Sequence, residues 1–387
     1  MISNLPDSAP HTLLINNDVA ARVLQMEDAL VSIESAFGQL AEGMATFQPR
    51  TDLWSPTARE GDYYRWGSLL GAISNPPTLA FRFKSDVITW TETDDGLTED
   101  WHTVRPGRLG GVILLIDTTD GALLAIMNDN LIQHIRVGAT VGVAAKYLAR
   151  KDSEVLGILG SGEMTRVYAE ALSIVRPIKE IRIYSRSPLR RETCAVELAE
   201  KLGLRVFATD TPEAALADVD IVATCTNAAR PVYHEAFLKT HRPGVFIVNV
   251  RPDEMDDQTP EIVDKVVVTA KAGLFDYILG SEEDRNRRPL DRFYRRRYVA
   301  VERPTLPDIV AGKLPGRESP TQTIFYDMMS AGVQFAAVGR LVYDQAKNLG
   351  LGVPIPPWRS DNPQIKSTKP FCAMPRYNIS ITVGLGK

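Results

Sequence analysis

The chain has 387 residues, of which 44% are hydrophobic and 24% charged, the composition of an ordinary globular protein. Lys and Arg total 44 against 48 Asp and Glu, and the resulting net charge of −4 gives no attraction for a nucleic acid. No stretch approaches the roughly 20 apolar residues that span a bilayer, and the N-terminal residues lack the pattern of a signal peptide. The widely spaced cysteines form no disulfide framework, and the histidines form no ligand-spaced pair. We therefore expect a soluble cytoplasmic protein without a metal centre and without a nucleic-acid or membrane partner.

The first third of the chain predicts one helix and a mostly antiparallel sheet. Apolar residues recur at helical spacing over residues 18–44. Residues 112–117 and 122–127 are strand-like and flank Thr-Thr-Asp-Gly, which is typical of a hairpin. Residues 54–70 and 94–109 are expected to be long loops that select the substrate side chain.

A strand is predicted over residues 79–90, because hydrophobic and charged residues alternate there. Phe81 and Phe83 are expected on the face that meets the core. Arg82 and Lys84 are expected on the opposite, cationic face.

After Asn128 the pattern changes to alternating strands and helices. A helix over residues 133–150 is followed by short apolar runs separated by helical segments, which predicts a parallel sheet covered on both faces. A long helix over residues 321–349 is expected to return to the first domain. The predicted strands are residues 155–159, 181–184, 205–207, 221–225, 245–250 and 265–269, with helices from residue 163, over 191–202 and at 212–217.

These elements predict an α/β protein with two domains. Residues 131–319 form a Rossmann dinucleotide-binding domain, and residues 1–130 and 320–387 form an α+β domain. The Arg-rich segment 281–303 is predicted to be a solvated insertion, with a flap over a cofactor as the alternative. The Pro-rich end, which begins near Pro354, is predicted to be an extended tail.

The central motif is a glycine turn between a strand and a helix, over residues 155–165. Gly160 permits a tight turn, and Gly162 lets the backbone approach a pyrophosphate at the helix N-terminus. A glycine-rich turn is common by itself, but here a strand precedes it and a helix follows. Thr165 replaces the usual third small residue. The predicted cofactor-binding residues of this turn are Gly160, Ser161, Gly162, Glu163 and Met164.

The second strand of the Rossmann pattern ends at Ser185, Arg186 and Ser187, without the acidic residue that accepts ribose hydroxyls in NAD sites. Arg186 and Arg190 match a 2′-phosphate in charge and geometry. NADP(H) is therefore favoured over NAD(H). The alternative is that Arg190 and its neighbour Arg191 only decorate the solvent face of the next helix.

Small polar residues end two later strands. Thr224, Cys225 and Thr226 follow one apolar run, and Asn249 follows the next. Residues at this edge commonly flank the nicotinamide ribose, so we predict that all four bind the cofactor, although ordinary loop residues would look the same.

Four segments in order resemble the ornithine cyclodeaminase/mu-crystallin family. They are the helix that begins at Arg136, the Gly160-Ser-Gly162 turn, the strand at residues 220–227 and the turn at residues 309–317. The resemblance implies hydride transfer at the α-carbon of an amino acid or its imine. It also implies a homodimer joined through the domain of residues 1–130 and 320–387, which holds the substrate.

The resemblance also assigns substrate residues. It implies that Arg136 holds the substrate carboxylate and that Arg50, in Gln48-Pro-Arg50, is a second anchor. The family has a lysine near the reacting carbon; the gapless match is Arg82, and Lys84 lies two residues further on. We predict proton transfer by Lys84 and electrostatic binding by Arg82, since a guanidinium does not readily lose a proton. Two solvent-facing cations are the alternative.

The family's catalytic aspartate has no clear counterpart in the segment 248–256, and Asp253 is the nearest candidate. The shortened loop favours an imine reductase or amino acid dehydrogenase. One alternative is an ornithine or lysine cyclodeaminase that releases ammonia and recycles bound NAD. Another is a crystallin-like protein that binds ligands without turnover.

Overall fold

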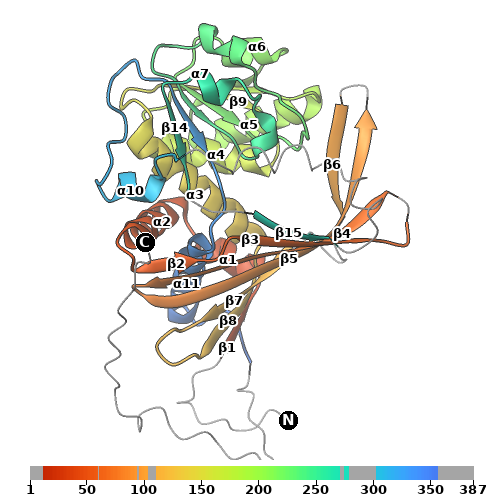
Figure 1. The fold of residues 1–387 in the computed structure, drawn as a ribbon, viewed down its shortest axis with the longest axis vertical. Helices are drawn as coiled ribbons and strands as arrows, with labels where there is room; N and C mark the ends of the chain where they lie inside the picture. Colours follow the sequence, from red (N-terminus) through yellow and green to blue (C-terminus); the bar gives the residue numbers. More distant parts are fainter. Residues whose placement is uncertain are drawn as a thin grey trace, which may run out of the picture.

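The computed structural model describes residues 12–59, 61–93, 96–102, 110–270, 274–278 and 302–355. The predicted Arg-rich insertion 281–303 lies almost entirely outside the described residues, as does the tail beyond residue 355. Two sheets organise the rest, and Figure 1 shows the smaller one above the larger. Every described helix is too short or too polar to cross a membrane.

The larger sheet has ten strands and is mostly antiparallel, as predicted. Its path runs β15-β3-β4-β5-β7-β8-β1-β17, and β2 and β6 pair with β4 and β5. Only the β1–β8 and β15–β3 pairs are parallel among the strands of this sheet that the structure describes. The strands are β1 (Thr12–Ile15), β2 (Ala45–Phe47), β3 (Arg50–Pro56), β4 (Asp62–Ser74), β5 (Pro77–Thr93), β6 (Gly96–His102), β7 (Gly111–Ile116), β8 (Leu123–Asn128), β15 (Leu274–Ile278) and β17 (Val353–Ile355).

The prediction of long loops at residues 54–70 and 94–109 is wrong where the structure describes them. The first segment contains the end of β3 and most of β4, and the second contains β6. β4, β5 and β6 extend past the body of the sheet as an arm that rises beside the layer of the smaller sheet (Figure 1). Trp54, Tyr63 and Ile88 give this arm its own small core.

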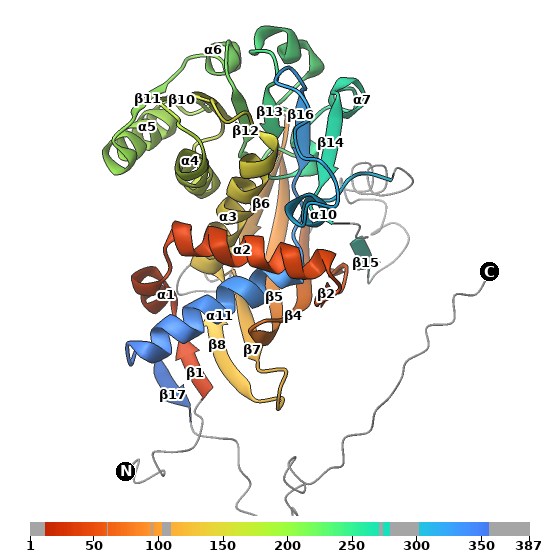
Figure 2. The same cartoon turned by 90° about the vertical axis from the view of Figure 1, so that its left-hand side faces the viewer.

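Three helices cover one face of the large sheet (Figure 2): α1 (Asn17–Val23), α2 (Met26–Ala41) and α11 (Gly332–Asn348). The predicted single helix 18–44 is interrupted because Leu24 adopts an extended conformation that ends α1. At Gly71 a Cβ would clash with the Gly332 backbone, so α11 begins directly on the sheet.

The faces of β5 are the reverse of those predicted. Arg82 is buried on the face that packs under α11, where it pairs with Asp129. Phe81 and Phe83 lie half-buried on the outer face, where both rings contact Trp66 and Phe83 stacks on it. The alternation was correct, but it does not tell which face is covered by helices.

The smaller sheet is fully parallel, with the order β11-β10-β9-β12-β13-β16-β14. This doubly wound arrangement confirms the predicted Rossmann architecture. The strands are β9 (Val155–Leu159), β10 (Glu180–Tyr184), β11 (Arg205–Ala208), β12 (Ile221–Thr224), β13 (Phe246–Val248), β14 (Lys265–Val268) and β16 (Ile324–Asp327).

Helices pack against both faces of the parallel sheet, and α3 also connects the two layers. Glycines at 138 and 142 let α3 approach α4 and α2 closely. The helices are α3 (Asn130–Leu148), α4 (Glu163–Val175), α5 (Pro188–Leu202), α6 (Pro212–Leu216), α7 (Thr259–Ile262) and α10 (Leu306–Val310), with 3₁₀ turns η1 (Glu235–Thr240) and η2 (Pro252–Glu254).

The predicted helix 321–349 is wrong at its start, because residues 324–327 form the strand β16. The domain boundary predicted at residue 320 is wrong for the same reason. Residues 324–327 are fully buried between β13 and β14, so the chain leaves the parallel sheet only after Asp327. A strand of only four residues next to a helix shows no periodicity of its own, and it was therefore predicted as part of that helix. Pro354 is likewise not in the tail, because β17 pairs with β1.

Candidate active site

A cavity of about 1590 Å³ lies between the arm side of the large sheet and the carboxyl edge of the parallel sheet. Most of the residues predicted for the site line its wall. These are Arg50, Arg82, Lys84, Arg136, Gly160, Ser161, Gly162, Glu163, Met164, Ser185, Arg186, Ser187, Arg190, Cys225 and Thr226. Thr224, Asn249 and Asp253 do not line it.

The glycine turn has the geometry that a dinucleotide requires. Gly160 has φ +122°, and a Cβ there would clash with the carbonyl oxygen of Cys225. Gly162 is the N-cap of α4, and a Cβ there would meet no protein atom within 4 Å. The Gly162 backbone therefore faces the cavity at a helix N-terminus, where N–H groups and the helix dipole favour a pyrophosphate. Arg166 fixes the turn by donating to the carbonyl oxygens of Ser161 and Gly162, both at 3.1 Å.

The end of β10 lies next to this turn. The Ser161 hydroxyl donates to Ser185 Oγ at 2.9 Å, and Ser187 caps α5 by accepting from the Arg190 backbone N–H. The Arg186 and Arg190 side chains are exposed and line the cavity. Arg191 is neither in the cavity wall nor on a solvent face, because it is buried and pairs with Asp210 at 2.6 Å.

Glu254 holds together the ends of β12 and β13, a role that was not predicted from the sequence. Its fully buried carboxylate accepts hydrogen bonds from the hydroxyls of Thr224 and Thr226 and from the backbone N–H groups of Thr226, Val250 and Arg251, between 2.5 and 3.0 Å. Burial raises the pKa of Glu254, and the hydrogen bonds oppose that rise. The predicted cofactor residue Thr224 thus acts behind the wall, as a support for the ends of β12 and β13.

Asn249 is also a support. Its side-chain amide donates to Asp327 at 2.9 Å and accepts from the backbone N–H of Met328 at 2.9 Å, which ties β13 to β16. Fully buried between strands, it presents no group to the cavity.

Asp253 lies in η2 and is buried, with a carboxylate oxygen 3.0 Å from Arg251. Its position outside the cavity wall does not support the predicted catalytic role. Arg251, which does line the cavity, pairs with both Asp253 and Glu99.

Arg136 projects from α3 and is completely buried. Its guanidinium donates to Gln133 at 2.7 Å, to Ser330 at 2.9 Å and to Gln334 at 2.8 Å, all neutral groups. Burial, and then the nearby charge of Arg82, lower the pKa of Arg136 to about 9. A buried cation whose hydrogen-bond partners among the described residues are all neutral is a strong site for a carboxylate.

Arg82 lies beside Arg136 but is already paired. Arg82 Nη2 is 2.6 Å from an Asp129 oxygen, and its guanidinium packs on the Phe335 ring that also contacts Arg136. Arg50 pairs similarly with Asp52 at 2.9 Å. These two cations therefore add to the electrostatic field at Arg136 while remaining fixed in place.

The Lys84 side chain lies against Gly110, where a Cβ would come within 3.0 Å of Lys84 Cε. In the sheet register Lys84 lies opposite Gly67 on β4 and Gly111 on β7. Its ammonium group is 3.2 Å from Asp86 Oδ1 and 3.8 Å from the centroid of the Trp101 ring. Burial lowers the pKa of Lys84 to about 8, although Asp86 opposes that shift. An amine that titrates near neutral pH is suited to proton transfer.

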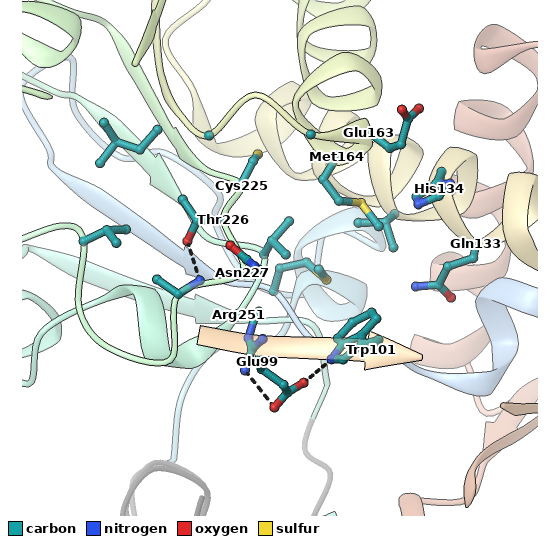
Figure 3. A pocket seen from close by; sticks show the side chains of 18 of the residues that line it. Glu99, Trp101, Gln133, His134, Glu163, Met164, Cys225, Thr226, Asn227 and Arg251 are labelled. Atoms are coloured by element: carbon teal, nitrogen blue, oxygen red, sulfur yellow. Dashed lines mark hydrogen bonds and ion pairs between the residues drawn. The ribbon is translucent and has the colours of Figure 1, made fainter. Parts of the chain in front are cut away.

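The arm closes this side of the cavity, and its residues were missed because β6 was read as a loop. The Trp101 indole donates to Glu99, and Glu99 lies 3.5 Å from Arg251 of the parallel-sheet layer. Thr98 forms a bridge with Ala228. Figure 3 shows Trp101, Glu99 and Arg251 around the same cavity as Gln133 and His134 of α3. Residues 96–102 contain only two apolar residues, Leu97 and Trp101, with three polar residues between them, so the sequence carries no strand alternation here.

The part of the chain that the structure describes contains no group of three or more His, Cys, Asp or Glu residues able to hold a metal ion. The chemistry of the wall is that of guanidinium groups, one perturbed lysine and a glycine turn. It fits a dinucleotide together with a small carboxylate.

Known proteins share this arrangement. The model of the ornithine cyclodeaminase/mu-crystallin family matches residues 99–350, well over half of the chain. A Δ1-pyrroline-2-carboxylate reductase of Bacillus cereus is 29% identical over 246 residues, 63% of this chain and 73% of that protein. An alanine dehydrogenase of Archaeoglobus fulgidus is 26% identical over 88% of this chain and 97% of its own length.

Among solved structures, the Δ1-pyrroline-2-carboxylate reductase of Thermococcus litoralis, in complex with NADH and L-proline, superposes with a TM-score of 0.70. It is 25% identical, and the match covers 89% of this chain and 100% of that one. The similarity thus extends over both layers and the cavity between them. On the family match and these relatives, the chain belongs to the ornithine cyclodeaminase/mu-crystallin family.

Proposed function

We propose that this protein reduces an α-imino acid to the α-amino acid at the expense of NAD(P)H, with Lys84 as the proton donor. It is an NAD(P)-dependent oxidoreductase that acts on the C–N bond of an amino acid or its imine, like its relatives. In the reaction, imino acid, NAD(P)H and one proton give amino acid and NAD(P)⁺. One observation carries the proposal: a lysine with a pKa of about 8 and a buried carboxylate anchor face the cavity that begins at the Gly160–Gly162 turn.

The nicotinamide ring, when bound, supplies the hydride. The protein positions the substrate: Arg136 binds the carboxylate as a bidentate partner, and Arg82 and Arg50 add positive charge around it. The substrate nitrogen then lies towards Lys84, which gives its proton as the α-carbon is reduced. Asp86 holds the Lys84 ammonium in place, and Trp101 limits the access of water.

The position of Asp253 gives no support to the cyclodeaminase alternative. That reaction needs a carboxylate at the substrate, whereas Asp253 does not line the cavity and pairs with Arg251. Reduction of an imine requires only the lysine and the carboxylate anchor from this chain. We therefore retain the reductase and its reverse, amino acid dehydrogenation.

We propose that NADP(H) is preferred over NAD(H). β10 ends without an acidic residue, and two exposed guanidinium groups, of Arg186 and Arg190, line the cavity beside Ser185 and Ser187. Guanidinium groups at this edge match a 2′-phosphate, whereas a ribose with free hydroxyls calls for a carboxylate.

We further propose a homodimer that forms through the outer face of the large sheet. The rings of Trp66, Phe81 and Phe83 contact one another there on the side away from α11, and Leu14 and Leu53 are exposed. An apolar patch of this kind on a sheet face favours association with a second copy. Two buried free thiols, Cys194 and Cys225, agree with a reducing compartment, which supports a cytoplasmic location.

The test is NADPH oxidation by the purified protein with Δ1-pyrroline-2-carboxylate and with 2-oxo acids in ammonia, which form α-imino acids in solution. We expect oxidation of NADPH and formation of the amino acid in equal amounts. Dinucleotide binding without turnover across this panel would favour the crystallin-like alternative. Ammonia release from ornithine without net NADPH oxidation would favour the cyclodeaminase.

A further inference from the structure

The strand pairing that supports the arm changes beside Lys84. In the described part of the sheet, β5 pairs with β7 as far as Lys84 and with β6 from Val87 onwards. Ser85 and Asp86 lie between these two ladders and are paired on their other side, with β4. The described part of β15 supports β3 up to Trp54, which is in the same row as Asp86. The sheet is therefore least supported at this row, where the arm leaves its body.

The arm is packed as a unit of its own. Trp54, Tyr63 and Ile88 form a core that is separate from the main core of the protein. The Trp90 ring packs against this core, with its centroid 6.0 Å from that of Trp54 and 5.6 Å from that of Tyr63. A segment with its own core keeps its internal contacts when it moves, so the arm is able to tilt as one body.

Two contacts among the described residues join β6 to the parallel-sheet layer across the cavity. Thr98 forms an antiparallel bridge with Ala228, in the loop after β12. Glu99 lies 3.5 Å from Arg251, in the loop after β13, and Figure 3 shows this pair at the edge of the cavity. The arm thus spans the cavity and meets the layer that carries the glycine turn.

The ion pair is built so that its separation leaves neither charge alone. Glu99 accepts a hydrogen bond from the Trp101 indole, which belongs to the arm, and Arg251 is 3.0 Å from Asp253, which belongs to the parallel-sheet layer. Burial by itself would raise the pKa of Glu99, but the charges of Arg251 and Arg65 lower it overall. Arg65 is also a residue of the arm, so Glu99 keeps a cation when Arg251 moves away. Such a contact suits a latch that opens and closes.

The position of β6 determines the surroundings of the Lys84 ammonium group. Trp101 is opposite Ile88, on the face of the sheet that carries Lys84 and Asp86. The ammonium group has the Trp101 ring centroid at 3.8 Å and Asp86 Oδ1 at 3.2 Å. These two neighbours restrict the directions in which Lys84 donates a proton. A shift of Trp101 therefore changes the proton donor as well as the access to it.

We propose that the arm is a clasp, which opens for substrate exchange and closes on the parallel-sheet layer in each turnover. Glu99 is its latch and a positioning residue, because in the closed state it holds Trp101 against Lys84. The structure shows the closed state. The effect on proton transfer rests on the proposed function, whereas the movement of the arm does not depend on it.

A disulfide between the two sides would lock the clasp shut. Partners in an antiparallel bridge have Cα atoms about 4.5–5.5 Å apart, which a disulfide spans without strain. Thr98→Cys combined with Ala228→Cys, in the full chain, is oxidised with glutathione disulfide, which is reduced to two molecules of glutathione. We expect the oxidised enzyme to turn over an imine about tenfold or more slowly than the same protein after treatment with dithiothreitol. Equal rates of the two forms would overturn the clasp.

The two single variants are the controls for this experiment. Ala228→Cys alone would reveal a disulfide with the native Cys225, and Thr98→Cys alone would reveal an effect of the new thiol itself. We expect oxidation to leave the turnover of both single variants unchanged. A loss of activity in either one would assign the effect to that thiol and overturn the explanation by locking.

Replacement of the latch tests the clasp without reference to the reaction. Glu99→Gln keeps an acceptor for the Trp101 indole but removes the charge that faces Arg251. In the double-cysteine protein we expect Glu99→Gln to lower the equilibrium constant for the disulfide, measured in a glutathione redox buffer, by about fivefold, because the arm is closed for less of the time. Glu92→Gln is the matched control, because Glu92 is exposed on β5 of the same arm and does not line the cavity. Equal constants in the two variants would overturn Glu99 as the latch.

The positioning role has a kinetic measurement of its own. With the native Thr98 and Ala228, Glu99→Gln should lower kcat for the imine by about tenfold, while the Kd of NADPH, measured by fluorescence, stays near the wild-type value. A wild-type kcat would overturn the positioning of Lys84 through Glu99. If no imine is reduced by the wild-type protein but the disulfide constant falls in Glu99→Gln, the proposed function fails and the clasp stands.

Discussion

The ammonium group of Lys84 lies 3.8 Å from the centroid of the Trp101 ring, which brings a residue of the arm onto the one lysine in the cavity wall of the described chain. Trp101 is half-exposed, at 50%, although it belongs to the wall. Its indole N–H is held by Glu99, which itself pairs with Arg251 of the other layer. The contact therefore links the proposed proton donor to both halves of the molecule.

Replacement of the proton donor should abolish most of the activity without loss of the fold. We expect Lys84→Met to lower kcat by roughly 10²- to 10⁴-fold, the usual contribution of a positioned acid. NADPH affinity, measured by fluorescence, should change little. Lys239→Met is the control, because Lys239 is exposed on η1 and does not line the cavity. A Lys84→Met enzyme with wild-type kcat would exclude Lys84 as the donor.

The pH dependence should report the lowered pKa of Lys84, which is about 8. Reduction uses the protonated amine, so kcat/KM for the imine should be constant below about pH 8 and fall roughly tenfold per unit above it. Oxidation of the amino acid uses the neutral amine and should rise with pH through the same value. The same profile in Lys84→Met would assign the titration to another group.

The carboxylate anchor should depend on the fork of the guanidinium and not on charge alone. Arg136→Lys keeps a positive charge but loses bidentate geometry, and we expect kcat/KM for the imine to fall by about 10²-fold, mainly through KM. Equilibrium binding of NADPH is the companion measurement, and it should be unaffected. A fall in kcat at constant KM would place Arg136 outside ground-state carboxylate binding.

The two glycines of the turn should respond differently to alanine. Gly160→Ala puts a Cβ against the Cys225 carbonyl at φ +122°, and we expect it to lower the free energy of unfolding by about 1–3 kcal/mol. Gly162→Ala meets no protein atom within 4 Å, so Tm should stay near the wild-type value while NADPH affinity falls. Calorimetry and fluorescence titration separate the two effects. A stable Gly162→Ala protein that binds NADPH normally would move the pyrophosphate away from this turn.

Cofactor choice should change when a cation in the first turn of α5, which follows β10, is removed. In Arg190→Ala the Kd for NADPH should rise by roughly tenfold or more, whereas the Kd for NADH should stay nearly constant, because only NADPH carries the 2′-phosphate. Arg182→Ala provides a comparison on the preceding strand, β10, since Arg182 pairs with Glu180 and does not line the cavity. Equal effects on both dinucleotides would contradict an NADP(H) preference set at Arg190.

The early strands of the parallel sheet could be predicted from the sequence, because each is a short apolar run next to a helical segment. β9 was predicted at its observed limits, and the Gly160 turn was recognised because strand, turn and helix occur in the order that the chemistry requires. β16 was missed because its four residues adjoin a helix and carry no alternation. Its place between β13 and β14 depends on pairing with distant strands, which local pattern does not encode.

For the site, cationic residues could be named from the sequence but their partners could not. Lys84 and Arg82 were identified as two cations on one strand face, yet their division of roles depends on Asp129 and Asp86, one at the start of α3 and the other two residues beyond Lys84. Glu254 is an acidic residue in a short turn, and only the fold brings five donors to it. Arg65 and Trp101 lie in segments that were read as loops, so the arm and its contacts were not predicted.

The most direct test of the account is the fate of the hydride. NADPH carrying deuterium at C4 of the nicotinamide, on the transferred face, is incubated with the enzyme and an α-imino acid, and the amino acid is analysed by mass spectrometry and NMR. We predict one deuterium per product molecule, located at the α-carbon, in amounts equal to the NADP⁺ formed. Amino acid product without deuterium at the α-carbon, or deuterium that stays in the dinucleotide while ammonia is released, would contradict the central claim.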